Sequence, residues 1–566
     1  MKFSKSFLGA SAVLLAAASS SCTNLDETVY DRITSTNFLQ TKDDVYRDFL
    51  RTFDHGYYTV EGSPYILQEL GADQLMTPTQ EGDWFDGGQY QRAHYHTWTT
   101  QEGYVNDTYF LLYKGIDFAT NSMEDIQAID PARFNMTVAE QKQLLAELRV
   151  MRAWYNLRLL DLFRNVQLIT KVKGETVGPA QSSPQDTYNF IESELKAVLP
   201  DLLTQGSPGQ LPGRWTKAAA AALLARLYLN ANVYVGQAHY TDCATVCQDI
   251  VSGKYGAYAI DSRWDAPFDW SNDKSTETIF AFPGSFSRSH WHYDIGMYYF
   301  MLPWNAPATY FGFTDYGQGN PRFSIQPGRD IDNNEYSFAQ GKAYVKFARY
   351  PDDVRLKTYK NLGNSVREGM FLKGYLPYNN NQDTVKSTRG YTLYMRDQVG
   401  LFRYAKPGQT LADKTSNMSN ADQNSGYHLI KYPFYPSTDP HKIESDYAEI
   451  RLAEVYYMLA ECKFRAGDKA TAATLLNTVR ARNYPAGSPS LYPAGGGTLT
   501  EQELLDEWGR EFIGEGRRRI DLVRFGKYNS STWWDKTPDS DDHTKIYPIP
   551  QNALNVSPQL KQNPGY

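Results

Sequence analysis

Cysteine is scarce in this chain, with 4 residues among 566, and this excludes a fold held together by disulfides. Lys and Arg number 57 against 64 Asp and Glu, so we do not expect a broad cationic surface for nucleic acid. Neither a Gly-rich phosphate loop nor a G-x-S-x-G motif occurs, so no P-loop nucleotide site and no α/β-hydrolase nucleophile is indicated.

Aromatic residues, by contrast, are abundant. Tyr accounts for 42 residues, Phe for 27 and Trp for 11. Tyr and Trp combine an apolar ring with a polar atom, and this combination suits binding surfaces that remain in contact with water. Since 41% of the residues are hydrophobic and 21% are charged, the composition is that of a globular protein and not of a disordered chain.

The N-terminus has the pattern of a secretory signal. Lys2 and Lys5 precede an apolar run over 7–18, which is too short to span a bilayer. Small residues follow, and then Cys22. This order looks like a bacterial lipoprotein signal over 1–21, with Cys22 lipidated and 22–45 forming a tether and the start of the fold. The usual leucine three places before the cysteine is replaced by Ser19, and the alternative is simple cleavage that leaves Cys22 free.

Helical periodicity is clear in four places. Residues 138–162 carry one apolar stripe, and Thr137 with Glu140 offers a capping box. Residues 215–232 and 240–252 predict a helical hairpin, and 451–482, broken at Gly467, predict a second one of tetratricopeptide type. We expect these hairpins, although separated in the sequence, to form a helical scaffold.

Residues 261–445 have a different character, rich in Tyr, Gly, Asn, Asp and Pro. The alternating run 342–347 suggests a short strand, and segments such as 378–383 read as loops. Long loops with few elements of their own are usually functional or disordered, and the dense aromatics favour ordered, functional loops here.

Several segments resemble the SusD/RagB family of outer-membrane lipoproteins. They occur in the family's order and cover nearly the whole chain from about residue 25. They are "GADQLMTPTQEGDWFDGGQYQRAHYHTW" (71–98), "RAWYNLRLLDLF" (152–163), "DYAEIRLAEVYYMLAEC" (446–462), "LLNTVRARN" (475–483), "EWGREFIGEGRRRIDLVRFGKY" (507–528), "IYPIPQNAL" (546–554) and "QNPGY" (562–566).

The resemblance implies a mainly α fold, in which tetratricopeptide-like hairpins support a loop-rich ligand-binding region with little β structure. It divides the chain into an N-terminal helical region (46–260), a loop-rich region (261–445) and a C-terminal region (446–566). It also implies a lipid-anchored protein on the cell surface that delivers oligosaccharides, or in some members peptides, to a SusC-type TonB-dependent transporter. The family has no catalytic activity and needs no cofactor, so we expect no enzyme.

Four features have more than one interpretation. The charges from Glu507 to Arg524, spaced three or four apart, predict ion pairs along a helix, and the alternative is a catalytic carboxylate pair. The pairs His94/His96 and His290/His292 are spaced for a metal on a strand, although polar packing beside aromatics is favoured.

Asp330, Asp332 and Asn334 imitate the start of a calcium loop. The sequence lacks the Gly and Glu of an EF-hand at the required places, so a turn is favoured over a looser calcium site. Cys243, Cys247 and Cys462 are expected to be buried as small apolar residues, with one disulfide as the alternative.

A sugar site needs flat rings for the C–H faces and polar groups for the hydroxyls. Two loop segments supply both, 73–92 and 289–316. For each ring the alternative is packing in the core. A peptide site would depend more on backbone contacts and charge, and a glycan-cleaving enzyme would need two flanking carboxylates. The predicted ligand residues are Trp84, Trp291, Trp304, Tyr310, Asp73 and Asp83.

Overall fold

The computed structural model describes residues 39–81, 85–284, 300–314, 319, 322–363, 366–404, 411–434 and 444–566. The chain divides into two compact units, 1–47 and 48–566, and the description below concerns the second. Cys22, Asp83, Trp84, His290, Trp291 and His292 lie outside the described residues, so the predictions made for them stay predictions.

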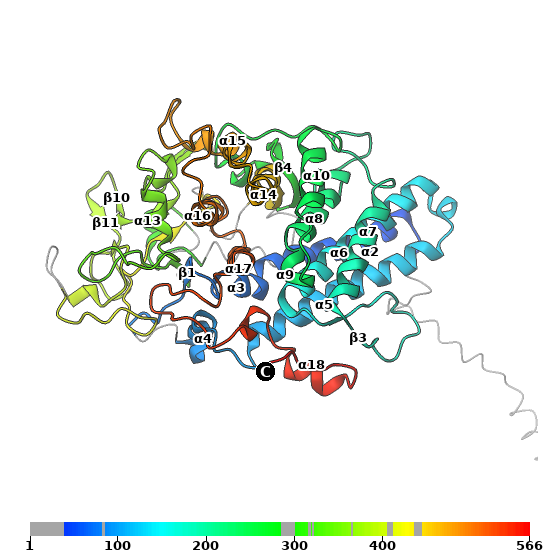
Figure 1. Ribbon diagram of the computed structural model, residues 1–566, viewed down its shortest axis with the longest axis horizontal. Coiled ribbons are helices and arrows are strands. Elements are labelled where there is room, and N and C mark those ends of the chain that lie inside the picture. Colours follow the sequence, from blue (N-terminus) through cyan, green and yellow to red (C-terminus); the bar gives the residue numbers. More distant parts are fainter. Residues whose placement is uncertain are drawn as a thin grey trace, which may run out of the picture. The chain divides into compact units, whose positions relative to one another are not determined.

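The second unit is mainly helical, as predicted, with helices gathered on one side and loops on the other (Figure 1). The α-helices are α2 Lys42–Glu61, α3 Ser63–Glu69, α4 Gln89–Tyr95, α5 Gly103–Ala128, α6 Val138–Phe163, α7 Pro184–Val198, α8 Lys217–Leu229, α9 Ala231–Val235, α10 Tyr240–Val251, α12 Ala306–Thr309, α13 Ala343–Ala348, α14 Leu452–Arg465, α15 Lys469–Arg480, α16 Glu501–Glu511, α17 Arg518–Arg524 and α18 Gln551–Val556.

Local signals account for the ends of the long helices. The Thr137 hydroxyl oxygen accepts a hydrogen bond from the backbone N–H of Glu140 at 3.0 Å and so caps α6, as the capping pattern predicts. Gly467, with φ +86°, separates α14 from α15, and the Asp468 carboxylate then accepts from the Thr471 N–H at 3.0 Å. The helix over 138–162 and the C-terminal hairpin are therefore confirmed.

Tertiary packing joins the two hairpins into one row. Helices pack in the order α5, α6, α7, α8, α10, α14 and α15. Although about two hundred residues separate α10 from α14 in the sequence, the two helices lie side by side (Figure 1). Cys243 and Cys247 on α10 and Cys462 on α14 are buried free thiols, which confirms their packing as small apolar residues. The loop-rich region is thus inserted between neighbouring hairpins of a single scaffold.

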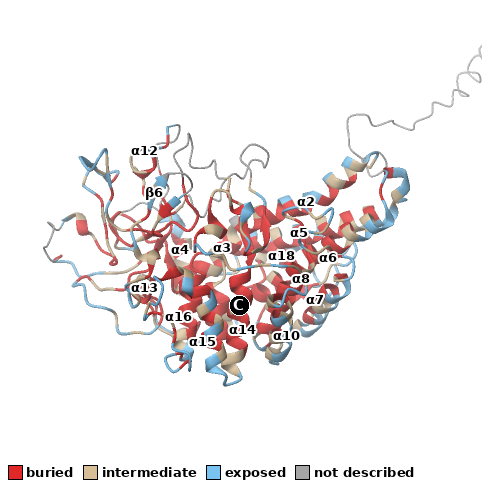
Figure 2. Cartoon of the chain, turned by 90° about the horizontal axis from the view of Figure 1, so that it is seen from above, coloured by how far each residue is buried: buried red, intermediate tan, exposed pale blue. Residues whose placement is uncertain are grey.

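A pair of strands marks the two ends of that insertion. Strand β4 (Thr278–Phe282) runs antiparallel to β14 (Tyr447–Arg451), with Tyr447 opposite Phe282. The other strands are short and pair in twos; they are β1 Leu75–Met76 with β5 Ser324–Ile325, β2 Val166–Gln167 with β3 Gln181–Ser182, β6 Lys360–Gly363 with β7 Val366–Glu368, β8 Phe371–Leu372 with β13 His428–Leu429, β9 Gly374–Tyr375 with β12 Tyr394–Met395, and β10 Pro377–Tyr378 with β11 Asp383–Thr384. Buried residues line the interior of the helical scaffold and also occur within the loop-rich region (Figure 2).

The strand predicted over 342–347 is wrong, because these residues belong to helix α13. Lys346 is buried and its ammonium lies 2.6 Å from the carboxylate of Asp506 on α16. A helix places Lys346 beside this partner, and the tertiary ion pair outweighs the local alternation of six residues.

Candidate functional site

Two of the predicted ligand residues lie around the short helix α12. Trp304 is partly buried just before the helix, and Tyr310 follows its last residue. The Tyr310 hydroxyl donates a hydrogen bond to the Tyr359 carbonyl, and burial raises the pKa of Tyr310 to about 12. Both side chains are therefore partly buried and keep part of their surface exposed.

Asp73 differs from the prediction because it is fully buried. Its two carboxylate oxygens lie 2.6 and 3.1 Å from the guanidinium of Arg518 on α17, and one also accepts the Gly341 N–H at 2.7 Å. Burial alone would raise the pKa of Asp73, but the Arg518 charge outweighs it and lowers the pKa to about 2. Asp73 therefore joins the N-terminal part of the fold to α17 and has no exposed surface.

The two predicted loop segments meet on a third, residues 385–404, which sequence reasoning did not single out. From the first segment, the Glu81 carboxylate lies 3.0 Å from Arg389 Nε and its backbone carbonyl accepts from Arg389 at 3.0 Å. From the second, the Asn305 side-chain amide donates to the Lys386 carbonyl at 2.7 Å. Glu81 is three residues from Trp84 and Asn305 is next to Trp304, so the third segment holds both predicted binding loops.

Rings and charges gather around the buried Glu81 carboxylate, in a surface that we call the Glu81 face (Glu81, Arg389, Tyr391, Arg403 and Tyr404). Arg403 Nε lies 2.6 Å from Glu81, and its guanidinium lies 4.5 Å from the Tyr404 ring centre. Tyr404 is 68% exposed, and Phe85, four residues after Glu81 in the sequence, is 55% exposed, although most aromatic rings of such size are buried. Exposed rings beside fixed polar groups are what a sugar requires.

The histidines His94 and His96 pack in the core, which confirms the structural interpretation. His94 Nε2 lies 2.5 Å from the Asp535 carboxylate and its ring packs against Trp534. His96 Nδ1 lies 2.7 Å from Asp539, and burial lowers the pKa of His96 to about 4. Among the residues that the structure describes, no cluster of three His, Cys, Asp or Glu side chains could hold a metal. Asp330 closes a turn instead, accepting from the Asn334 N–H at 2.9 Å.

The charged motif 507–524 forms ion pairs, but only partly along one helix. Gly514 and Gly516 have φ of +73° and +69°, so the chain turns between α16 and α17. Arg524 pairs with Asp521 three residues earlier at 2.8 Å, whereas the carboxylates nearest the turn pair with arginines of other elements. The glycines break the helix, so the predicted continuous ladder is wrong for the middle of the motif.

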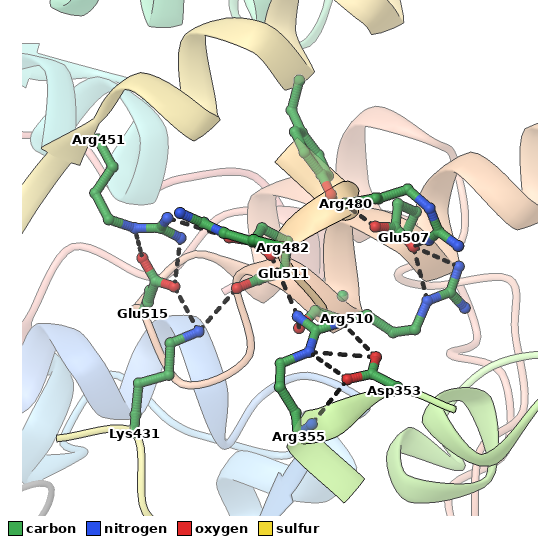
Figure 3. A network of polar contacts seen from close by, with 12 residues as sticks. Asp353, Arg355, Lys431, Arg451, Arg480, Arg482, Glu507, Arg510, Glu511 and Glu515 are labelled. Atoms are coloured by element: carbon green, nitrogen blue, oxygen red, sulfur yellow. Dashed lines mark hydrogen bonds and ion pairs between the residues drawn. The ribbon is translucent and has the colours of Figure 1, made fainter. Parts of the chain in front are cut away.

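Glu511 and Glu515 are the centre of this buried network (Figure 3). Arg451, at the end of β14, lies 3.1 Å from Glu511 and 2.8 Å from Glu515. Burial alone would raise the pKa of Glu507, but Arg480 and Arg510 outweigh it and keep the pKa below its usual value. A carboxylate that is enclosed and paired with arginines is closed to a substrate, so we interpret the motif as stabilising the fold.

A polar cavity of about 120 Å³ lies within the helical scaffold. Arginines and carboxylates line it in pairs, among them Arg226 with Glu454 at 2.6 Å and Arg517 with Glu454 at 2.8 Å. The space suits a few water molecules, which such charged walls would hold. It is smaller than the pockets of about 300–1,000 Å³ that take small-molecule ligands.

Two family models match the chain. One, described as the SusD family, matches residues 379–566, and the other, described as starch-binding associating with outer membrane, matches residues 50–229. The starch-binding protein SusD of Bacteroides thetaiotaomicron is 28% identical over 453 residues, 76% of this chain and 74% of that protein. The SusD-like protein P25 of Formosa agariphila is 32% identical over 127 residues, 20% of this chain and 24% of that one.

Solved structures show the same fold. A SusD homologue from Bacteroides thetaiotaomicron superposes with a TM-score of 0.65 at 18% identity, covering 94% of this chain and 98% of its own. The surface glycan-binding protein A of Bacteroides uniformis gives 0.63 at 18% identity, covering 92% and 99%. The predicted SusD-like architecture is therefore confirmed. Among the helices that the structure describes, none combines the length and the hydropathy of a membrane span.

Proposed function

This chain belongs to the SusD family, and from this we propose that it is a glycan-binding protein working at the outer membrane. The observation that carries the proposal is its similarity, over three quarters of its length, to a protein named for starch binding. The Glu81 face supports it, since it presents the exposed Tyr404 ring beside fixed charges on the loops.

We place the ligand against the Glu81 face and the adjoining Trp304. Trp84, Trp291 and Asp83 remain predicted contacts, and Tyr310 is a partly buried neighbour. The protein holds the glycan without cleaving it. After incubation with a bound oligosaccharide, product analysis should find the chain length unchanged.

Single substitutions test this placement. Tyr404→Ala should weaken glycan binding by about 1–3 kcal/mol, the range known for an aromatic ring stacked on a planar base and used here as an analogue. Because the Tyr404 ring is 68% exposed, the variant protein should melt at the same temperature as the wild type. Trp304→Ala should weaken glycan binding as well. Thermal unfolding measured on the same variant distinguishes a loss of affinity from a loss of core packing.

A glycan array and a peptide panel, run in parallel on the full chain, decide between the two ligand classes. Saturable binding of peptides, together with no binding of any glycan, would show that the protein is a peptide-binding protein instead. Since the curated relative over most of the chain is named for starch, we expect binding on the glycan array.

Delivery to a SusC-type TonB-dependent transporter and anchoring through Cys22 complete the proposal. A tethered binding protein at a transporter mouth raises the local ligand concentration. Cys22→Ala should release the protein from the membrane fraction or trap its precursor, and normal fractionation would contradict the anchor. A transporter should co-purify in mild detergent, and recovery only as a free monomer in several detergents would contradict the partner.

A further inference from the structure

The middle of the loop-rich region is basic although the protein is acidic, whereas the whole region 261–445 is nearly balanced, with 21 Lys and Arg against 19 Asp and Glu. Residues 300–434 contain 17 Lys and Arg against 11 Asp and Glu, a net of +6. The rest of the chain has 40 against 53, a net of −13. A charge asymmetry of this kind favours ligands of the opposite sign at the basic part.

An aromatic and cationic surface lies at the short sheet of β9 and β12 in this region. Tyr375 and Tyr394 are directly opposite in the antiparallel pair, and their ring centres are 4.6 Å apart. Tyr375 is 47% exposed. The Arg396 guanidinium lies 4.6 Å from the Tyr394 ring and 4.8 Å from that of Phe402, so the two rings hold it in place.

A second cation, Lys373, directly precedes β9. Its ammonium lies 2.5 Å from the Tyr344 hydroxyl and 5.0 Å from the centre of that ring. Tyr344 in turn packs against Tyr427 at 4.6 Å. Burial lowers the pKa of Lys373, which means that its charge costs free energy in the unliganded protein.

Neither cation has a carboxylate partner among the described residues, in contrast to most arginines of the scaffold. The carboxylate next in sequence, Asp397, points elsewhere and accepts the Gly328 N–H at 2.9 Å. An anion bound at this surface would offset the cost of two partly desolvated positive charges without having to displace an ion pair.

We propose that this surface, the Tyr375 face (Lys373, Tyr375, Tyr394 and Arg396), binds an acidic saccharide unit. The tyrosine rings take the C–H face of the sugar, and the cations take its carboxylate or sulfate group. The proposal rests on the proposed glycan-binding function and narrows it to acidic glycans. A neutral glucan would satisfy the rings and leave both charges without a partner.

Paired probes test the charge requirement on one sugar backbone. Oligogalacturonate is compared with its methyl ester, and a sulfated galactan oligosaccharide with its desulfated form, which has no remaining charge, by calorimetric titration of the full chain in mild detergent. Each acidic form should bind at least about tenfold more tightly than its neutral counterpart, as charge-assisted hydrogen bonds predict. The pair that shows the larger difference identifies carboxylate or sulfate as the recognised group.

Variants assign the effect to the face. Arg396→Gln and Lys373→Gln should each lose about tenfold in affinity for the acidic form only, and Arg396→Lys should restore part of it. Tyr375→Ala should weaken the acidic and neutral forms alike, because stacking does not depend on charge. Lys254→Gln is the matched control, since it removes an exposed charge that pairs with Asp249 at 2.6 Å in the helical part.

The outcomes separate this proposal from the proposed function. Equal binding of acidic and neutral forms, or full affinity in folded Arg396→Gln and Lys373→Gln variants, would overturn the acidic specificity while glycan binding stands. Binding of no glycan at all would overturn both. If Arg396→Gln lowers the melting temperature, Lys373→Gln and the neutral-sugar titration still decide, because they do not depend on Arg396 packing.

Discussion

Replacing Glu511 with Gln should destabilise the protein through charge alone. The Glu511 carboxylate is buried and lies 3.2, 3.1 and 2.8 Å from the guanidinium groups of Arg355, Arg451 and Arg482 (Figure 3). Burial alone would raise the pKa of Glu511, but Arg482, Arg451 and Arg355 outweigh it and hold the pKa far below its usual value. The glutamine has nearly the same shape but cannot balance the arginines.

The magnitude follows from the charge balance of the surrounding cluster. Four cations are connected by ion pairs to four carboxylates, and the variant leaves one buried positive charge uncompensated; the eight residues are Arg355, Lys431, Arg451, Arg482, Glu277, Asp353, Glu511 and Glu515. Removing one partner of a buried ion pair typically costs about 3–5 kcal/mol. At about 2.1 cal/mol/K per residue over roughly 520 residues, this lowers the melting temperature by about 3–5 °C.

Differential scanning calorimetry measures this fall in melting temperature for Glu511→Gln, with Glu175→Gln as the control variant. Glu175 is 49% exposed and pairs with Lys171 at the surface, so its loss should cost less than about 1 kcal/mol. Glycan affinity per folded molecule should be unchanged in both variants. If Glu511→Gln melted within about 1 °C of the wild type, the reasoning that this network stabilises the fold would be refuted.

Two further substitutions report on the scaffold. Burial raises the pKa of Glu69 to about 8 in the folded protein, compared with 4.5 in the unfolded chain. The folded state therefore favours the protonated carboxyl, and the stability that Glu69 contributes is present below pH 4.5 and is lost as the pH rises to 8. The stability of the wild type relative to Glu69→Gln should fall by up to about 1.4 kcal/mol per pH unit in urea titrations, and a constant difference would contradict the shift. Gly115→Ala places a methyl group against the Tyr155 ring between α5 and α6 and should cost about 1–3 kcal/mol or more. Gly103→Ala, where space is open, should be neutral or stabilising in the same melts, and equal melting of the two variants would argue against close packing there.

Local signals along the chain are enough to predict the helical elements of this protein. The apolar stripe and Thr137 cap of α6, and the Gly467 break between α14 and α15, act within one or two helical turns, so they can be read locally. The family pattern and the aromatic loop segments were likewise visible in the sequence.

Which of these elements contact one another depends on packing between distant segments of the chain. Periodicity gives no information on the partner of a helix face, so the packing of α10 on α14 could not be predicted from either hairpin. Ion pairs depend on distances in space, and this is why Glu511 pairs with arginines from three other segments and why Asp73 is buried under Arg518. For the same reason the segment that joins the binding loops, and the Tyr375 face beside it, emerge only when residues distant in the chain are brought together.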